Sequence, residues 1–259
     1  MFLNRRLADD GLQRMRQAGV IVLSAHLDDA CFSVGGLLSA LQGGTLINVF
    51  NRSTYLARPP EGALGPLTES EVACLREAED QAFACRVGLK TESLNGCEPG
   101  FFGRRPNDLA GLAQDVLQVK DALLAALQQH VRRDHTKPCL WVPMAIGRHV
   151  NHHAVYEIVL QERERLQADF ELCFYEDLPY AHDPVERSRG VRRFTNTPCW
   201  AQWSRHVFMT PASAKLALVA LYATQLKRKP SRFKFRPAAL TPFALHEALW
   251  MAPPERKDR

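Results

Sequence analysis

Two short segments, far apart in the chain, hold histidines and carboxylates at spacings that suit metal chemistry. The first runs from Ser24 to Asp29 (SAHLDD) and carries one imidazole and two adjacent carboxylates. The second runs from Gly147 to His153 (GRHVNHH) and carries three imidazoles. Two histidines and one carboxylate would form an open site for a divalent metal ion, with water in the remaining position. The second carboxylate would then be free to act as a base on that water.

Each of these residues also has an ordinary structural explanation. An aspartate that follows a buried strand is often a helix cap, so Asp28 or Asp29 could cap the next helix. A single histidine near an apolar strand is usually a hydrogen-bonded structural residue. Each residue alone favours the structural explanation. Both groups together, at the ends of two predicted strands, make a metal site a real alternative to the structural explanation.

The elements that must position these residues form an alternating pattern of strands and helices. Short apolar runs rich in β-branched residues predict strands at 19–25, 45–50, 140–144 and 171–176. Helices are predicted at 35–41, at 68–87 with a Thr68–Glu71 capping box, at 107–133 with Asn107 as its cap, at 151–167 and at 211–227. The segments 51–66 and 95–106 are long loops of the kind that often bind ligands.

This alternation predicts an α/β fold with a mostly parallel sheet covered by helices on both faces. Such sheets bind ligands beyond the carboxyl ends of their strands, and both histidine segments directly follow predicted strands. The sequence has no internal repeat and no linker rich in Gly or Ser that would mark a domain boundary. We therefore expect a single domain over 1–259, with a C-terminal extension from about residue 227.

Composition places the chain among ordinary globular proteins. Its 259 residues are 46% hydrophobic and 24% charged, which excludes disordered and collagen-like classes. The net charge of +5 suits an anionic small substrate and is too weak to indicate nucleic-acid binding. Seven cysteines without a CxxC pair argue against a disulfide framework. No apolar run approaches the roughly 18 residues that span a bilayer, so we expect a cytoplasmic protein without membrane insertion.

Other basic residues could contact an anionic substrate. A cluster at 227–236 could bind phosphate or a membrane surface, but a solvated loop after a helix is the simpler interpretation. Because this cluster is local, it does not indicate nucleic-acid binding. Four loop arginines could reach a phosphate or sugar hydroxyls near the metal: Arg52, Arg58, Arg104 and Arg105.

Five segments resemble motifs of the PIG-L/LmbE-like metal-dependent deacetylases. AHLDDA at 25–30 resembles their AHPDDE signature, and GRHVNH at 147–152 resembles their later GxHxDH element. Three further segments are similar to that family: REAED at 76–80 with Val87 and Gly88, YEDLPY at 175–180, and Lys215 with YATQ at 222–225. The resemblance extends from about residue 20 to residue 226, which is most of the chain.

The resemblance implies a Rossmann-like, three-layer α/β/α domain of the LmbE type with one catalytic zinc ion per chain. It implies that His26, Asp29 and His152 bind the metal. Asp28 would be the general base, and His149 would stabilise the tetrahedral intermediate or protonate the leaving amine. Such a donor set would also accept iron(II) or cobalt(II). The family often forms homo-oligomers, and the sequence leaves the oligomeric state open.

The implied activity is that of a hydrolase acting on a linear amide bond. It would remove the N-acetyl group from an N-acetylglucosamine-type amino sugar in a small glycoside or glycoconjugate. Two alternatives stay open. One is another metal-dependent amidase on the same scaffold, acting on a larger acyl group or a non-sugar amide. The other is a catalytically silent sugar-binding relative.

Three residues depart from the family motifs: Leu27 replaces proline, Ala30 replaces glutamate and Asn151 replaces aspartate. Leu27 removes no functional group, whereas Ala30 removes a carboxylate near the site. The aspartate at position 151 would support the protonated form of the neighbouring histidine, so an uncharged amide predicts a lower pKa for His149. The next histidine, His153, could take over that role instead. The intact ligands and base favour an active enzyme.

Overall fold

The computed structural model describes residues 4–7, 9–60, 62, 65–134, 136–227, 229, 234, 235, 237 and 245–253. These residues form an eight-stranded sheet in the order β1-β7-β8-β6-β5-β2-β3-β4. The strands are β1 (Asn4–Arg6), β2 (Val20–Ser24), β3 (Gly44–Asn48), β4 (Leu89–Ser93), β5 (Cys139–Pro143), β6 (Glu171–Tyr175), β7 (Ser204–Met209) and β8 (His246–Met251). The helices are α1 (Asp9–Ala18), α2 (Asp29–Leu41), α3 (Glu69–Val87), α4 (Leu112–Gln128), α5 (Val150–Gln161), α6 (Arg163–Asp169), α7 (Pro184–Asn196) and α8 (Ala212–Val219).

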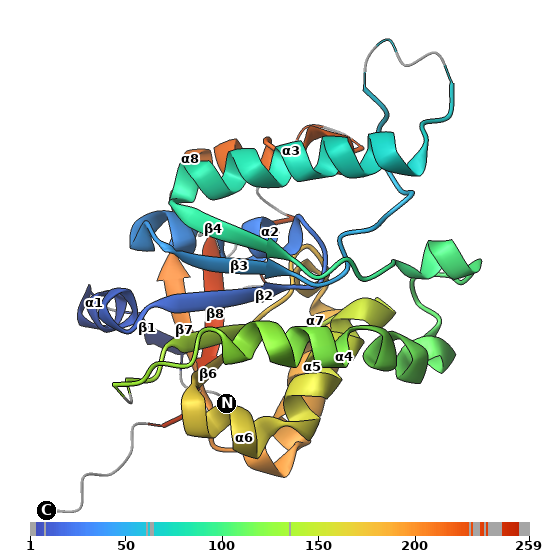
Figure 1. The fold of residues 1–259 in the computed structure, drawn as a ribbon. Helices are drawn as coiled ribbons and strands as arrows, with labels where there is room; N and C mark the ends of the chain where they lie inside the picture. The colour runs from blue at the N-terminus through green and yellow to red at the C-terminus, as the bar shows by residue number, and fades with distance from the viewer. Residues whose placement is uncertain are drawn as a thin grey trace, which may run out of the picture.

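The sheet is mostly parallel, as the sequence predicts. Only β8 among the described strands is antiparallel to its neighbours, and it lies between β6 and β7. Helices α2, α3 and α8 lie on one side of the sheet, and α4, α5 and α6 lie on the other (Figure 1). The three-layer α/β/α architecture is therefore confirmed.

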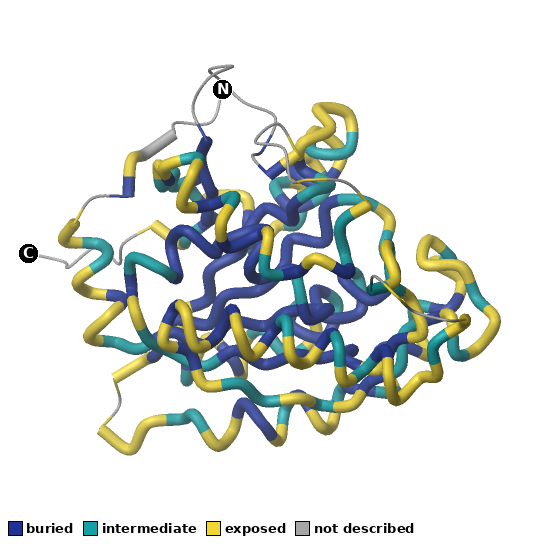
Figure 2. Tube along the Cα trace, turned by 90° about the horizontal axis from the view of Figure 1, so that it is seen from above, coloured by how far each residue is buried: buried dark blue, intermediate teal, exposed yellow. Residues whose placement is uncertain are grey.

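The core lies along the central strands. Strands β2 and β5 are buried over their whole length because helices cover both faces of the sheet. Figure 2 shows this buried centre surrounded by segments of intermediate and high exposure. Polar side chains that serve a ligand must therefore emerge where the strands end.

The chain order places a switch point between β2 and β5. From β2 the chain adds β3 and β4 on one side, and then returns to add β5 and β6 on the other. Loops that follow the two strands diverge at such a point, which leaves a crevice where α/β sheets bind ligands. The first histidine segment follows β2 and the second follows β5.

The four predicted strands and the helix at 68–87 are present, and the segment 35–41 is part of the longer helix α2. Two predicted helices are shorter than expected, and one is divided. The helix predicted at 107–133 begins at Leu112, because Asp108 and not Asn107 caps a preceding 3₁₀ turn. The helix predicted at 151–167 divides into α5 and α6 at Glu162. The helix predicted at 211–227 ends at Val219.

The early end of α8 is explained by contacts with α3. Tyr222 donates to Asp80, and the backbone and hydroxyl of Thr224 both donate to Glu79. These bonds hold residues 223–225 in a 3₁₀ turn against α3. Two of the family-like segments are thus joined to each other.

Lys215, a third family-like residue, has a structural role. It is fully buried and pairs with Glu247 of β8. Glu247 also accepts hydrogen bonds from the backbone of Gly36 and Leu37, beside the non-helical residue Val34 of α2. The ion pair therefore satisfies backbone donors that the interruption of α2 leaves free.

The expected C-terminal extension contributes a strand to the sheet. Residues 246–251 form β8, which the sequence analysis did not predict. Of the basic cluster at 227–236, the structure describes Lys227, Lys229, Lys234 and the buried Phe235, whose ring lies 5.0 Å from that of Phe32. The other residues of that cluster lie outside the described ranges. Within those ranges, no helix is long and apolar enough to cross a membrane.

Candidate active site

The turn that follows β2 carries the first group of candidate residues. Ser24 donates to the carbonyl oxygen of His26 and accepts from the backbone N–H of Ala30, which fixes the turn. Asp28 occupies the N-cap position of α2, yet its side chain makes no capping bond among the described residues. Asp29 accepts from the backbone N–H of His26. Helix capping therefore does not account for Asp28.

The turn that follows β5 carries the second group. Ala145 and Gly147 both have positive φ angles, 56° and 94°. Arg193 donates to the carbonyl oxygen of Ala145 at 2.7 Å and so supports this strained turn. The turn leads into α5, where His149 is the N-cap and its Nδ1 accepts from the backbone N–H of Asn151.

His26, Asp29 and His152 converge although they come from the two separate segments. Their ligand atoms lie within 4.8 Å of one another, and all three residues are buried. Asp29 Oδ2 is 3.1 Å from Nδ1 of His26 and 3.2 Å from Nε2 of His152. Nε2 of His152 is buried, and its contact with Asp29 is an ion pair that does not meet hydrogen-bond geometry. Two imidazoles and one carboxylate that converge in this way fit a divalent metal ion.

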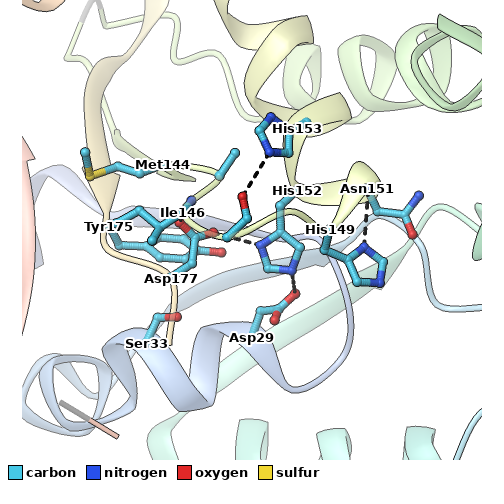
Figure 3. Close-up of polar contacts among 12 residues, drawn as sticks. Asp29, Ser33, Met144, Ile146, His149, Asn151, His152, His153, Tyr175 and Asp177 are labelled. Atoms are coloured by element: carbon cyan, nitrogen blue, oxygen red, sulfur yellow. Dashed lines mark hydrogen bonds and ion pairs between the residues drawn. The ribbon is translucent and has the colours of Figure 1, made fainter. Parts of the chain in front are cut away.

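Asp177, at the end of β6, holds His152 from behind. Its Oδ1 lies 2.7 Å from Nδ1 of His152, and its Oδ2 accepts from the backbone N–H of Ile146 (Figure 3). A carboxylate on the non-ligating nitrogen is usual for metal-binding histidines. The sequence analysis did not assign a role to Asp177. Its position directly after a predicted strand was the signal that could have found it.

The ionisable groups of this cluster influence one another strongly. Burial alone would raise the pKa of Asp29, but the positive charges of His152 and His26 lower it well below its usual range. Burial would lower the pKa of His152, but the carboxylates of Asp29 and Asp177 raise it to about 10. The imidazoles of His26 and His152 are thus protonated, and a divalent cation would replace one proton on each ring.

Asp28 lies beside the cluster and faces the pocket. Burial and the neighbouring charge of Asp29 raise the pKa of Asp28 to about 6, although the cation of Arg76 opposes this rise. Nη2 of Arg76 lies 3.7 Å from Oδ1 of Asp28, and its Nη1 donates to Glu98 at 2.7 Å. A carboxyl group with a pKa near neutrality suits a general base.

His149 also lies against the cluster, with its ring centroid 4.3 Å from that of His26. Burial and the charges of His26 and His152 lower its pKa. That asparagine at position 151 gives His149 a lower pKa than aspartate would stays a prediction, and no hydrogen bond joins the side chains of His149 and Asn151 in the described structure. Asn151 places its Oδ1 3.1 Å from Nε2 of His26 instead.

Three other candidates lie away from the cluster. His153 points in the opposite direction, with Nε2 3.2 Å from the carbonyl oxygen of Gly147 (Figure 3). It does not line the pocket, so it is not placed to replace His149. The loop arginines Arg52 and Arg104 are engaged by carboxylates in ion pairs.

A cavity of about 590 Å³ lies over the cluster. Its walls include His26, Asp28, Asp29, Phe32, Thr54, Tyr55, Arg76, Glu98, Pro106, His149, Tyr180 and Gln225. A second cavity of about 270 Å³ adjoins it and shares three of these residues, Pro106, His149 and Tyr180. The larger cavity has the size of a small-molecule site, and its walls carry several polar and charged side chains.

A family model described as GlcNAc-PI de-N-acetylase, PIG-L, matches residues 21–162, which include both histidine segments. The chain belongs to the PIG-L family. The PIG-L chain is 30% identical over 188 residues to 2'-N-acetylparomamine deacetylase from Streptomyces fradiae. This similarity covers 70% of the chain and 64% of that protein, so the chain spans just under two thirds of the relative's length.

Solved structures with this PIG-L fold include two further deacetylases. The A40926 pseudoaglycone deacetylase Dbv21 has a TM-score of 0.59 and 22% identity, over 90% of this chain and 96% of that one. A deacetylase of the teicoplanin pathway, in complex with teicoplanin, has a TM-score of 0.59 and 18% identity, over 90% and 97% of the two chains. These similarities confirm the expected LmbE-type fold.

Proposed function

We propose that this chain is a metal-dependent N-deacetylase, a hydrolase of a linear amide bond. Its substrate is an N-acetylglucosamine-type amino sugar within a small glycoside or glycoconjugate. The observation that carries the proposal is the position of Asp28 beside the buried cluster of His26, Asp29 and His152, in the wall of a cavity. Membership of the PIG-L family supports it, as do relatives named as deacetylases of an acetylated aminoglycoside and of a pseudoaglycone.

We infer one divalent metal ion per chain, held by His26, Asp29 and His152, with zinc as the favoured ion. When bound, such an ion polarises an amide carbonyl and lowers the pKa of a water molecule. Iron(II) and cobalt(II) suit the same donor set. One structural neighbour is described as a zinc-inhibited form of teicoplanin deacetylase, so metal titrations should extend beyond one equivalent.

The residues around the cluster have separate roles in the proposed reaction. Asp28 takes a proton from the attacking water, because its raised pKa suits it to accept one. His149 accepts a hydrogen bond at Nδ1, so its proton resides on Nε2. The neutral ring of His149 can donate this Nε2–H to the oxyanion of the intermediate, and Asp28 would pass the proton that it took from the water to the leaving amine. Arg76 and Glu98, in the cavity wall, can bind sugar hydroxyls.

We also propose that the chain acts as a single domain in the cytoplasm, where its seven free cysteines would stay reduced. A homo-oligomer is compatible with this proposal. The substrate is a small molecule and not a nucleic acid, because the proposed catalytic residues line a cavity and not an exposed basic surface.

The proposal is tested by the metal content of the purified protein together with acetate release from a panel of substrates. The panel contains methyl N-acetylglucosaminide, N-acetylglucosamine 1-phosphate and 2'-N-acetylparomamine, each also with a longer acyl chain. We expect one metal ion per chain and acetate release from at least one acetylated compound. Bound metal without release of any acyl group would favour the silent relative. Faster release of the longer chain would favour the other amidase.

A further inference from the structure

Asn151 connects the proposed metal ligand His26 to a buried carboxylate on α4. Its Oδ1 lies 3.1 Å from Nε2 of His26, and its Nδ2 donates to Oδ2 of Asp115 at 3.2 Å. Asp115 is completely buried, and its other oxygen pairs with Arg104 from the preceding loop. A continuous set of polar contacts therefore runs from this loop to the metal cluster.

We propose that Asp115 is a positioning residue that acts through Asn151 to select the nitrogen of His26 that faces the metal. The inference rests on the proposed function, because it assumes a metal ion at the cluster. The ion pair of Asp115 with Arg104 favours the ionised form of the Asp115 carboxylate, which accepts hydrogen bonds and cannot donate one. The amide of Asn151 must therefore turn its NH₂ group toward Asp115 and its oxygen toward His26.

The orientation of the amide fixes the proton on His26. The amide oxygen only accepts, so Nε2 of His26 must carry a hydrogen. Nδ1 is then the nitrogen with a lone pair to offer, and it lies 3.1 Å from Oδ2 of Asp29. His152 offers the opposite nitrogen, because Asp177 holds its Nδ1. The two ligands would thus bind one ion through different nitrogens. Asp177 fixes the ring of His152 directly, and Asp115 fixes the ring of His26 through Asn151.

Asp115 matters because residue 151 is an amide. An asparagine can turn by 180° and exchange its donor and acceptor, whereas both oxygens of an aspartate accept. Without an acceptor behind it, Asn151 could donate to Nε2 of His26. The ring proton would then move to Nδ1 and block the ligand. Asp115 compensates for the uncharged residue at position 151.

The sequence also provides the space that these contacts need. A Cβ atom on Gly111 would lie 1.6 Å from Nη1 of Arg104. The backbone of Gly111 has an ordinary φ of −81°, so its conformation does not demand glycine. A side chain at position 111 would instead displace the guanidinium of Arg104 from its ion pair with Asp115.

The test measures metal affinity and the tautomer of His26 in Asp115→Asn. We expect the zinc affinity of this variant to be about 10- to 100-fold lower than that of the wild type. Competition with a chromophoric chelator measures this affinity. Nitrogen-15 NMR of the zinc-loaded wild type should show His26 protonated at Nε2, and the variant should show a mixture. Asp80→Asn is the matched control, because Asp80 is also buried but binds Tyr222 and Asn48. Its zinc affinity should not change.

A charge exchange separates positioning from general destabilisation. In the double variant Asn151→Asp/Asp115→Asn, the carboxylate faces His26 and the amide lies behind it, so zinc affinity should recover. A folded Asp115→Asn protein with unchanged affinity, or wild-type His26 bound through Nε2, would overturn the inference. Loss of folding in Asp115→Asn without recovery in the double variant would also overturn it. Wild-type protein that binds zinc but releases no acyl group would contradict the proposed function alone.

Discussion

Oδ1 of Asp177 lies 2.7 Å from Nδ1 of His152, and both side chains are almost completely buried. The second oxygen of Asp177 binds the backbone of Ile146, so one carboxylate joins the turn after β5 to a histidine on α5. This leaves Nε2 of His152 directed toward Asp29. The proposed metal affinity therefore depends on a residue that does not itself bind the ion.

Asp177→Asn is predicted to weaken zinc binding by about 10- to 100-fold, as is typical for a partner of a metal-binding histidine. An amide cannot accept at both positions, so either His152 or Ile146 meets an NH₂ group. Chelator competition at neutral pH measures the effect. The control is Asp183→Asn, at the exposed N-cap of α7, where asparagine caps equally well. Equal affinity in the two variants would show that Asp177 does not orient the ligand.

Asp28→Asn is predicted to retain the metal and to lower kcat by about 10²- to 10⁴-fold, because the amide cannot accept the proton. Asp29→Ala, which removes a proposed ligand, should lose most of the metal. Metal analysis and acetate release on the same preparations distinguish the two roles. Metal loss as complete in Asp28→Asn as in Asp29→Ala would assign Asp28 to the ligand set.

The pH dependence of kcat/KM should show an acid limb at or below about pH 6. Burial and Asp29 raise the pKa of Asp28 to about 6, and a bound cation would lower it from there. Asp28 must be ionised to act as a base, so activity falls as pH falls through this pKa. Arg76→Gln removes a cation that favours the ionised form, and the limb should move to higher pH. An unmoved limb would assign the titration to another group.

Glu176 should stabilise the fold in a pH-dependent way. It is buried between Arg187 and Arg205, each 2.7 Å away. Burial would raise its pKa, but the two guanidinium groups lower it well below its usual range. This stabilisation is fully present above the unfolded-state pKa of about 4.3 and is lost as pH falls toward the folded-state value.

Glu176→Gln should therefore reduce the free energy of unfolding at neutral pH by about 3–5 kcal/mol. The difference from wild type should shrink in acid, where the wild-type carboxylate is increasingly protonated. Urea unfolding at several pH values measures both effects. A difference that stays constant with pH would contradict the ionic account of Glu176.

The fold and the grouping of candidate ligands could be predicted because parallel strands end at one edge of the sheet. The side-chain partners of Asn151 could not be predicted. The sequence suggested His149 as a partner because it lies two positions away, but residues at i and i+2 do not face each other on a helix. Asn151 instead faces α4, where Asp115 lies 36 residues earlier in the chain and follows no local pattern.

The missed strands have a physical explanation of their own. β4 (Leu89–Ser93) and β7 (Ser204–Met209) are only partly buried, and their polar residues hide the apolar run on which strand prediction relies. β8 is well buried, but it begins with His246 and Glu247, whose side chains bind residues far away in the sequence such as Arg205 and Lys215.

The central claim is that a metal ion at the cluster and Asp28 beside it hydrolyse an acetamide. The most direct measurement adds zinc stepwise to metal-stripped protein and follows acetate release from the best substrate of the panel. We predict that wild-type activity rises until one equivalent per chain is bound. Asp28→Asn should bind the same equivalent and release almost no acetate. Full activity in stripped protein, or equal activity in the two proteins at one equivalent, would contradict the account.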